Sequence, residues 1–150
     1  MTPKDAIKAL ARELGLDAVG IASAEPFIER GAIAQERLQL GLMGDLPWYT
    51  EARVERGSDP QRVLPGARSI ISLAMSYLTP LLERPPDDAL RGRVSNYAWG
   101  ADYHKLLQKR LRTFVRRLPE VVGGPVRAKA YTDTGPLQDR AVAERAGVGW

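Results

Sequence analysis

Asp133 is the residue whose setting in this 150-residue chain most favours chemistry. It lies in "YTDTGPLQDR", residues 131–140, between a segment that alternates like a strand and one with helical spacing. In layered α and β folds, turns that leave strands line the crevice where ligands bind. A carboxyl group placed there can donate a proton if burial raises its pKa. An aspartate between Thr and Gly is also typical of a helix cap or a turn, so the residues alone leave both interpretations open.

The side chains that the sequence lacks limit the chemistry further. There is no cysteine, and His104 is the single histidine. This composition excludes disulfides, thiolate nucleophiles, thiolate-held clusters and histidine-rich metal sites for this chain, so we predict no metal ligands. One histidine leaves a Ser-His-Asp triad conceivable, but a histidine beside Tyr103 is more often a hydrogen-bonded structural residue. The glycines lack the spacing of nucleotide-binding loops.

Basic and aromatic residues gather in the second half of the chain. From residue 91 to residue 129 there are ten bases and two acids, so this segment carries about +8 against +4 for the whole chain. Such clustering is a possible surface for a polyanion such as RNA, although a solvated helix face explains most basic runs. Tyr97 and Trp99 in "SNYAWG" are either core anchors or flat surfaces for a ligand or a nucleobase.

These residues must be positioned by a series of alternating helices and strands. Thr2 and Pro3 predict a helix start, and Gly15 predicts its end. The spacing of apolar residues over 101–118 predicts the strongest helix, which Pro119 should end. We expect helices over 3–14, 26–41, 101–118 and 136–146, strands over 17–23, 68–77 and 126–131, a long loop or two short helical turns over 41–67, and a mobile loop over 79–93.

This order predicts one domain of the α/β class, a layered arrangement of helices and strands without internal repeats. No segment is apolar enough to be read as a membrane span or a signal peptide, so we expect a cytoplasmic protein. The residues do not decide whether the sheet is parallel or mixed.

Three stretches together resemble the amino-terminal half of one enzyme family. They are "RGSDPQRVLPGARSIISLAMSY", "YAWGADYHKLLQKRL" and "YTDTGPLQDRAVAERAGVGW", and the likeness covers nearly the whole chain in the right order. The family that they resemble is epoxyqueuosine reductase, the cobalamin-dependent iron–sulfur enzyme of tRNA modification.

The resemblance implies a nitroreductase-like cobalamin-binding domain over residues 1–150, followed in the complete enzyme by a ferredoxin-like domain with two 4Fe-4S clusters. Electrons from an external donor would reach cobalt through the clusters, and epoxyqueuosine in the tRNA anticodon loop would be reduced to queuosine. We expect a monomer that does not bind membranes.

The resemblance also implies roles for individual residues. Asp133 matches the family's proton donor. Positions around the cobalamin are matched by Arg56, Ser95, Asp133 and Arg140, and Tyr97 and Trp99 fall close by in the same motif as Ser95. A dry site between a corrin and a flipped-out base would keep the Asp133 carboxyl protonated. A tRNA-backbone surface would be formed by Lys109, Arg112, Arg116 and Arg117.

The absence of cysteine means that this chain carries no cluster ligand of its own. We therefore expect an incomplete cobalamin-binding domain, with Trp150 an internal residue of the longer enzyme, that is inactive alone. The alternative is a stand-alone RNA- or corrinoid-binding module without electron transfer.

Overall fold

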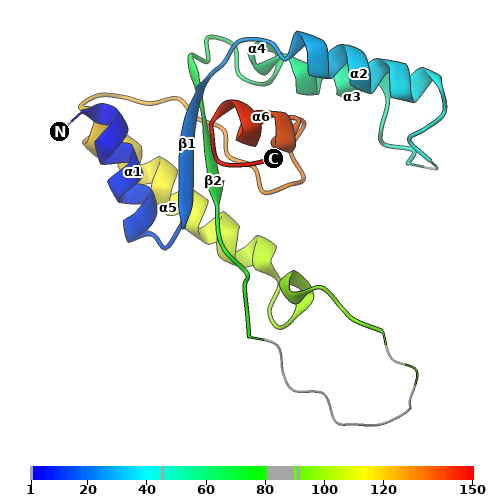
Figure 1. Ribbon diagram of the computed structural model, residues 1–150. Coiled ribbons are helices and arrows are strands. Elements are labelled where there is room, and N and C mark those ends of the chain that lie inside the picture. The colour runs from blue at the N-terminus through cyan, green and yellow to red at the C-terminus, as the bar shows by residue number, and fades with distance from the viewer. Residues whose placement is uncertain (1, 45, 81–89, 91) are drawn as a thin grey trace.

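The computed structural model describes residues 2–44, 46–80, 90 and 92–150. Helices surround a pair of strands (Figure 1). In chain order the elements are α1 (Pro3–Glu13), β1 (Ala18–Ser23), α2 (Ile28–Gln39), α3 (Glu51–Ser58), α4 (Pro60–Val63), β2 (Ser69–Ala74), the 3-10 turn η1 (Asn96–Ala98), α5 (Tyr103–Val122) and α6 (Asp139–Arg145).

The predicted start of the first helix is confirmed, and hydrogen bonds between Thr2 and Asp5 cap it. The Thr2 hydroxyl accepts a hydrogen bond from the Asp5 backbone N–H, and the Asp5 carboxylate accepts one from the Thr2 backbone N–H. This reciprocal capping box satisfies two backbone donors that the first turn would otherwise leave free. Pro3 follows at the first helical position, where its missing N–H costs nothing.

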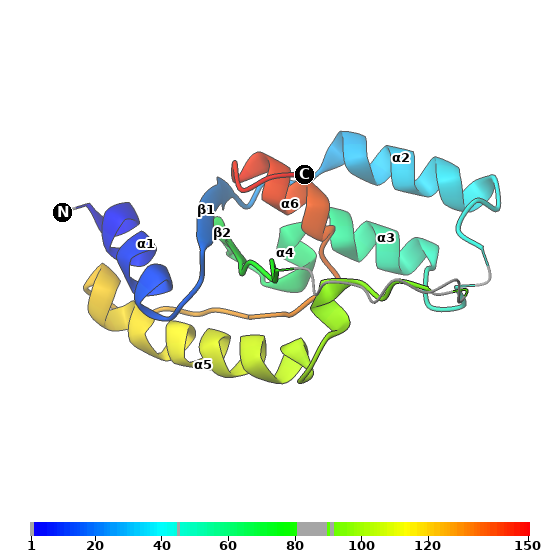
Figure 2. The same ribbon diagram turned by 60° about the horizontal axis from the view of Figure 1, so that its bottom comes forward.

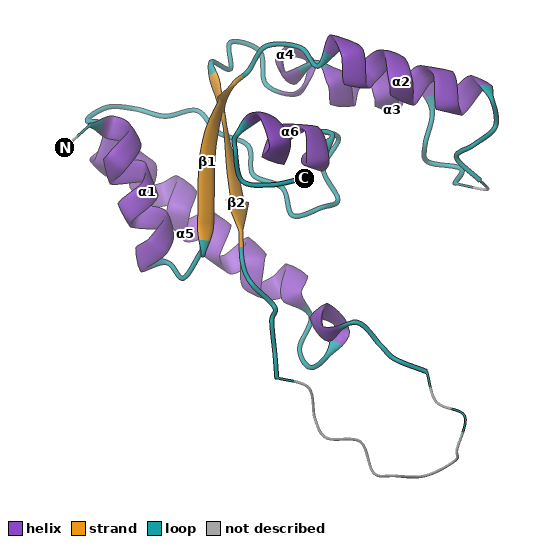
Figure 3. Ribbon diagram, viewed as in Figure 1, coloured by secondary structure: helices purple, strands orange, loops and turns teal. Residues whose placement is uncertain are grey.

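The two strands form an antiparallel pair with helices on both faces. Ala18 lies opposite Ala74 and Ser23 opposite Ser69. Helices α5 and α6 lie on opposite sides of the strands (Figure 2), and α6 approaches β1 so closely that a Cβ added at Gly20 would lie 2.2 Å from the Ala146 carbonyl oxygen. Within the described residues the fold is therefore mixed, with many helices and a small sheet (Figure 3).

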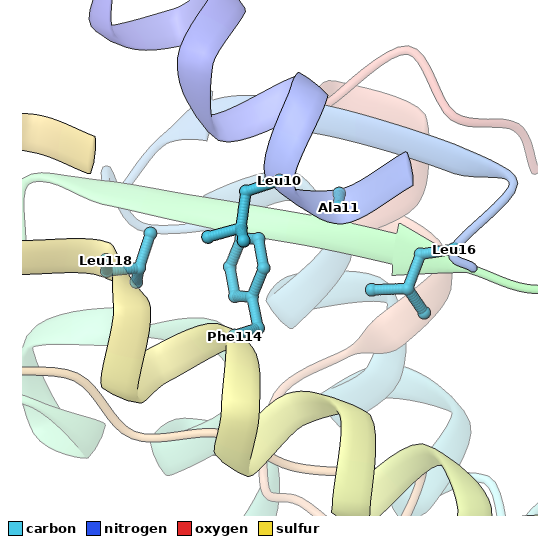
Figure 4. Close-up of a cluster of buried hydrophobic side chains, with 5 residues drawn as sticks. All are labelled: Leu10, Ala11, Leu16, Phe114 and Leu118. Carbon is cyan, nitrogen blue, oxygen red and sulfur yellow. The ribbon is translucent and has the colours of Figure 1, made fainter. Parts of the chain in front are cut away.

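The main hydrophobic cluster joins α1 to α5. Leu10 and Ala11 of α1 pack with Phe114 and Leu118 of α5, and Leu16, at the start of the connection to β1, closes the cluster (Figure 4). All five are at most 4% exposed. Because these contacts fix α5 against α1, the first turn of α5 is held at a defined place relative to the sheet.

The prediction that Pro119 ends the longest helix is wrong. Helix α5 continues to Val122 and ends at Gly123, whose φ of 75° is the left-handed conformation of a helix C-cap. Pro119 removes one backbone donor, but its carbonyl still accepts from the Gly123 and Gly124 N–H groups. Val121 also packs against the main cluster, so the last turn keeps both its hydrogen bonds and its apolar contact.

The strand predicted over residues 126–131 is also wrong. This segment has no strand assignment and its residues are exposed. In place of a backbone ladder, the Arg127 guanidinium donates to the Pro65 carbonyl at 2.8 Å, and the Lys129 ammonium donates to the Val63 carbonyl at 2.7 Å. Alternating residue types indicate a strand only where a neighbouring strand supplies hydrogen bonds and burial.

The other predicted elements are confirmed with shifted ends. The strand predicted over 68–77 ends at Ala74, and the last helix begins at Asp139, later than Pro136. Residues 41–67 contain the two short helices α3 and α4, one of the two expected alternatives. Most of the loop expected over 79–93 lies outside the described residues. None of the helices in the described ranges combines the length and apolar character that crossing a bilayer requires.

Candidate active site

The turn of residues 132–136 is clamped between α3 and α5. On the α3 side, Arg53 Nη2 donates to the Gly135 carbonyl oxygen at 2.9 Å. The next residues are tied to the same helix, because Gln138 Nε2 donates to Ser58 Oγ at 2.8 Å. On the α5 side, the first two residues of the helix contact Asp133. The packing that fixes α5 against α1 therefore also positions this turn.

Gly57 of α3 makes the tightest approach to the turn. A Cβ at residue 57 would lie 2.2 Å from the Pro136 carbonyl oxygen, a backbone atom that cannot move without moving the turn. We expect Gly57→Ala to lower the free energy of unfolding by about 1–3 kcal/mol, because overpacking outweighs the better helix propensity of alanine. Urea denaturation measures this change.

The matched control for Gly57→Ala is Gly124→Ala. No atom lies within 4 Å of the Cβ position at Gly124, so its effect should stay within about 0.5 kcal/mol. A Gly57→Ala variant as stable as the wild type would contradict the close packing of α3 against the turn.

Asp133 adopts a backbone conformation that is uncommon for a residue with a side chain. Its φ of 40° is the only positive value among the described non-glycine residues. The Tyr103 hydroxyl donates to Asp133 Oδ2, and His104 Nε2 lies 3.0 Å from Asp133 Oδ1. Strain of this kind persists only where surrounding contacts hold it, and it gathers at functional sites. Tyr103 and His104 supply those contacts here.

A second carboxylate holds the histidine from the other side. Asp102 caps α5, with its Oδ1 accepting from the His104 backbone N–H at 2.9 Å and lying 2.9 Å from His104 Nδ1. The Tyr103 and His104 rings stack with centroids 4.1 Å apart. Asp102, His104 and Asp133 thus form one continuous chain of hydrogen-bonding groups.

The charges in this chain shift the pKa values of its members. The Tyr103 hydrogen bond, with help from His104, lowers the pKa of Asp133 below its ordinary value. Hydrogen bonds from His104 to Asp102 and to Asp133 raise the pKa of the imidazole. The Asp133 hydrogen bond raises the pKa of the Tyr103 hydroxyl to about 12. In the chain alone 51% of the Asp133 side chain is exposed. The dry, protonated Asp133 expected between a corrin and a base stays a prediction.

Asp133 lines a cavity of about 840 Å³. The cavity lies between β2, α5 and the segment that follows α5, drawn in orange in Figure 2. Ile70, Leu73 and Leu107 contribute to its apolar walls. Thr132 is 7% exposed and lines the same cavity, and its Oγ1 has no hydrogen-bond partner among the described residues. Buried polar atoms are rarely left without a partner, so this hydroxyl fits a site that receives a polar ligand group.

Of the two aromatic residues expected near a cofactor, Tyr97 reaches this site through its contact with Tyr103. The ring of Tyr97 meets the ring of Tyr103 edge-on with centroids 5.9 Å apart, and it meets Tyr77 at 6.1 Å. Tyr97 and Trp99 are 51% and 39% exposed. The Trp99 indole N–H donates to the Val94 carbonyl at 3.0 Å, which fixes the orientation of its ring.

The other three residues expected around a cofactor do not line the cavity beside Asp133. Arg56 lines a separate pocket of about 280 Å³ together with Trp48, Arg53 and Pro136, so it faces the far side of the turn. Ser95 precedes η1 and is exposed. The Arg140 guanidinium lies over the Trp150 ring at 5.6 Å.

The basic residues of α5 divide into an exposed stripe and two structural contacts. Arg117 pairs with Glu13 of α1, and Arg110 Nη1 donates to the Gly15 carbonyl at 2.6 Å. The stripe consists of Lys105, Lys109, Arg112 and Arg116. These residues are all exposed and follow one another at intervals of four, three and four residues. Three of the four bases predicted to bind RNA therefore face solvent, and Arg117 is held by α1.

Sequence reasoning missed the partners of Asp133. His104 was interpreted as a structural residue, and Tyr103 and Arg53 were given no role. The available signal was "DYH" at the first turn of the strongest helix, because an aspartate at a helix start caps the backbone and brings the next side chains to one end of the site. The distance in sequence between residues 104 and 133 concealed their contact.

A family model described as epoxyqueuosine reductase QueG, DUF1730, matches residues 58–134, just over half of the chain. This range contains β2, α5 and the first residues of the clamped turn. Among curated proteins, an epoxyqueuosine reductase of Gloeobacter violaceus is 44% identical over 148 residues, which cover 96% of this chain and 43% of that protein.

Solved structures of epoxyqueuosine reductase are also similar. One, a crystal structure with an epoxyqueuosine-modified tRNA-Tyr stem loop, matches with a TM-score of 0.83 and 32% identity over 98% of this chain and 38% of that one. Another, from Bacillus subtilis, has a catalytic loop swung out of the active site and matches with a TM-score of 0.79 and 30% identity over 98% of this chain and 38% of that one.

The chain spans about two fifths of the length of the curated relatives and solved structures that it matches. The matches to these relatives run through nearly all of the described elements, and the family model includes Asp133 itself. On this basis the chain belongs to the epoxyqueuosine reductase family.

Proposed function

We propose that this chain is the amino-terminal part of an enzyme that reduces epoxyqueuosine to queuosine in the tRNA anticodon loop. The observation that carries the proposal is the position of Asp133. Its carboxyl lines the 840 Å³ cavity from a strained turn that α3 and α5 hold in place. The similar structure with an epoxyqueuosine-modified stem loop supports the same substrate for this protein.

Cobalamin is the proposed cofactor, and the residues around the cavity suit it. The apolar wall from β2 can cover a corrin face, and the unpartnered Thr132 hydroxyl can bond a corrin amide. Outside the cavity, Arg56 and Arg140 carry guanidinium groups that would suit amide oxygens and the nucleotide phosphate of a cofactor that extends beyond it, with Ser95 as a further hydroxyl. Bound cobalamin would supply the electrons that break the carbon–oxygen bond.

The residues of this chain would position the modified base and deliver a proton. When the epoxide opens, its oxygen gains negative charge and needs a proton, which the Asp133 carboxyl is placed to give. Tyr97, which contacts Tyr103, and Trp99, just before the start of α5, are partly exposed rings on which a base or the corrin can stack. The Tyr103 hydroxyl and His104 hold the carboxyl while a ligand enters.

The exposed stripe on α5 is the proposed surface for the tRNA backbone. The stripe begins beside the Asp133 site at Lys105 and runs to Arg116, roughly 16 Å along the helix axis. Phosphates that follow this line would place the anticodon loop near the cavity. Contacts of this kind read charge and shape more than sequence.

The remaining features of the enzyme are proposed from the family resemblance. We propose that this chain contributes to a nitroreductase-like layered domain of the complete enzyme. The complete enzyme would bind 4Fe-4S clusters outside this chain and receive electrons from an external donor. It would be a monomer in the cytoplasm. The two-stranded sheet with helices on both faces supports a layered arrangement.

The direct test is conversion of the substrate. The full-length protein, reconstituted with iron, sulfide and hydroxocobalamin and supplied with a chemical reductant, is mixed with tRNA that carries epoxyqueuosine. Mass spectrometry of the nucleosides should show loss of one oxygen atom and formation of queuosine, and omitting cobalamin should prevent it. No queuosine under conditions in which the Gloeobacter relative converts its tRNA would refute the proposal. Binding of tRNA and cobalamin without conversion would favour the binding module without electron transfer.

A further inference from the structure

His104 occupies an unusual position between two carboxylates. Its Nδ1 lies 2.9 Å from Asp102 Oδ1 and its Nε2 lies 3.0 Å from Asp133 Oδ1. Ionised carboxylates only accept hydrogen bonds, and a neutral imidazole has one donor nitrogen. Both contacts are therefore satisfied only when the ring is an imidazolium that donates from both nitrogens. The geometry places a mobile proton directly beside the residue that must deliver one.

We propose that His104 stores the proton that Asp133 delivers, and that Asp102 orients it. The inference deepens the proposed function and rests on it. The proton moves from Nε2 to Asp133 Oδ1, where an N–H bond breaks and an O–H bond forms. The same O–H bond then breaks as the proton passes to the negatively charged oxygen of the opened epoxide, which becomes a hydroxyl group. His104 is left as a neutral imidazole, and its 33% exposed side chain allows solvent to reprotonate it.

The surroundings explain why the transfer waits for a ligand. In the chain alone, water solvates the charged pair of His104 and Asp133, and the ionised carboxylate is favoured. A ligand that fills the cavity removes this water, which disfavours both charges and moves the proton to the carboxyl. The lowered pKa of Asp133 in the chain alone and the protonated acid that the chemistry needs are then two states of one site.

The other polar and charged groups at the site also affect which residues carry a proton. Tyr103 donates to Asp133 Oδ2 and so favours the carboxylate, an effect that the loss of water around the pair must outweigh. Asp139 also lines the cavity, and loss of water around its carboxyl raises its pKa, with a further rise from Asp133 and an opposing effect of Arg53. Asp102 remains ionised, because its hydrogen bonds with His104 lower its pKa.

The first test is a proton NMR titration of His104 in the protein without cobalamin or tRNA. The His104 signal is assigned by its disappearance in His104→Gln. We expect its pKa to lie above the ordinary 6.5, and to fall both in Asp133→Asn and in Asp102→Asn, because each variant removes one negative partner. A pKa at or below 6.5, or one that neither variant changes, would overturn the inference. This readout does not depend on whether the protein converts epoxyqueuosine.

The second test separates proton storage from positioning. Glutamine at residue 104 can donate a hydrogen bond to Asp133 but cannot release a proton, so turnover should fall about 10- to 100-fold and its decline with rising pH should move to lower pH, where the Asp133 carboxyl alone loses its proton. In the wild type that decline should follow the raised pKa of His104, because the neutral imidazole has no proton to give. An unchanged pH profile in His104→Gln, in an enzyme that converts its substrate, would refute the relay and leave the proposed function standing.

Discussion

Asp133→Asn is expected to reduce turnover of epoxyqueuosine about 10²- to 10⁴-fold, the usual contribution of a positioned general acid. Asparagine has nearly the shape of aspartate and can still accept a hydrogen bond from Tyr103, but it cannot transfer a proton. The loss should therefore appear in kcat, with cobalamin and tRNA still bound. Single-turnover assays with mass spectrometry, together with the visible spectrum of the cobalamin complex, measure the two parts separately.

Asp5→Asn is the matched control for this variant. Asp5 is an exposed carboxylate at the start of α1, and its hydrogen bonds with Thr2 can be kept by an amide oxygen. The same chemical change there should leave turnover as in the wild type. If Asp133→Asn reduced cobalamin binding and turnover in equal proportion, Asp133 would be a structural residue of the pocket.

Reversing the charge of Lys109, Arg112 and Arg116 to glutamate is expected to weaken tRNA binding about 10²- to 10³-fold at low salt. Each change replaces an attraction to a phosphate with a repulsion, and a protein that neutralises fewer phosphates releases fewer counterions when it binds. The slope of log affinity against log salt should therefore flatten by about two to three. Fluorescence anisotropy with a labelled anticodon stem loop, measured over a series of salt concentrations, gives both quantities.

A second triple variant separates the local surface from net charge. Lys4, Arg12 and Arg37 are exposed bases of α1 and α2, outside the stripe. Their reversal changes the total charge equally but should weaken tRNA binding far less. Equal weakening in the two variants would show that the protein attracts tRNA only through its overall charge, and the α5 surface would have no special role.

The elements that the sequence predicts well are those whose signals are local. The cap at Thr2, the glycine after α1 and the apolar spacing of α5 depend on neighbouring residues, and all three are present. The strand expected over 126–131 failed because a strand depends on a partner elsewhere in the chain. Pro119 failed as a stop signal because packing of the last turn outweighed one missing hydrogen bond.

The candidate site shows the same division. The turn around Asp133 could be located from its residue types, but its contacts with Tyr103 and His104 cross about thirty residues of sequence. Arg117 looks like its neighbours in the sequence, and only the packing of α1 against α5 reveals its pairing with Glu13. Charge state also depends on this packing, because the pKa of Asp133 is set by groups on another element.

The central claim is that the Asp133 carboxyl meets the substrate oxygen inside the cavity. A crystal structure of the full-length protein with cobalamin and an epoxyqueuosine-modified stem loop tests it most directly. We predict the corrin against the β2 wall and an Asp133 carboxyl oxygen about 2.6–3.2 Å from the epoxide oxygen. A corrin bound elsewhere, with Asp133 still turned to solvent, would contradict it.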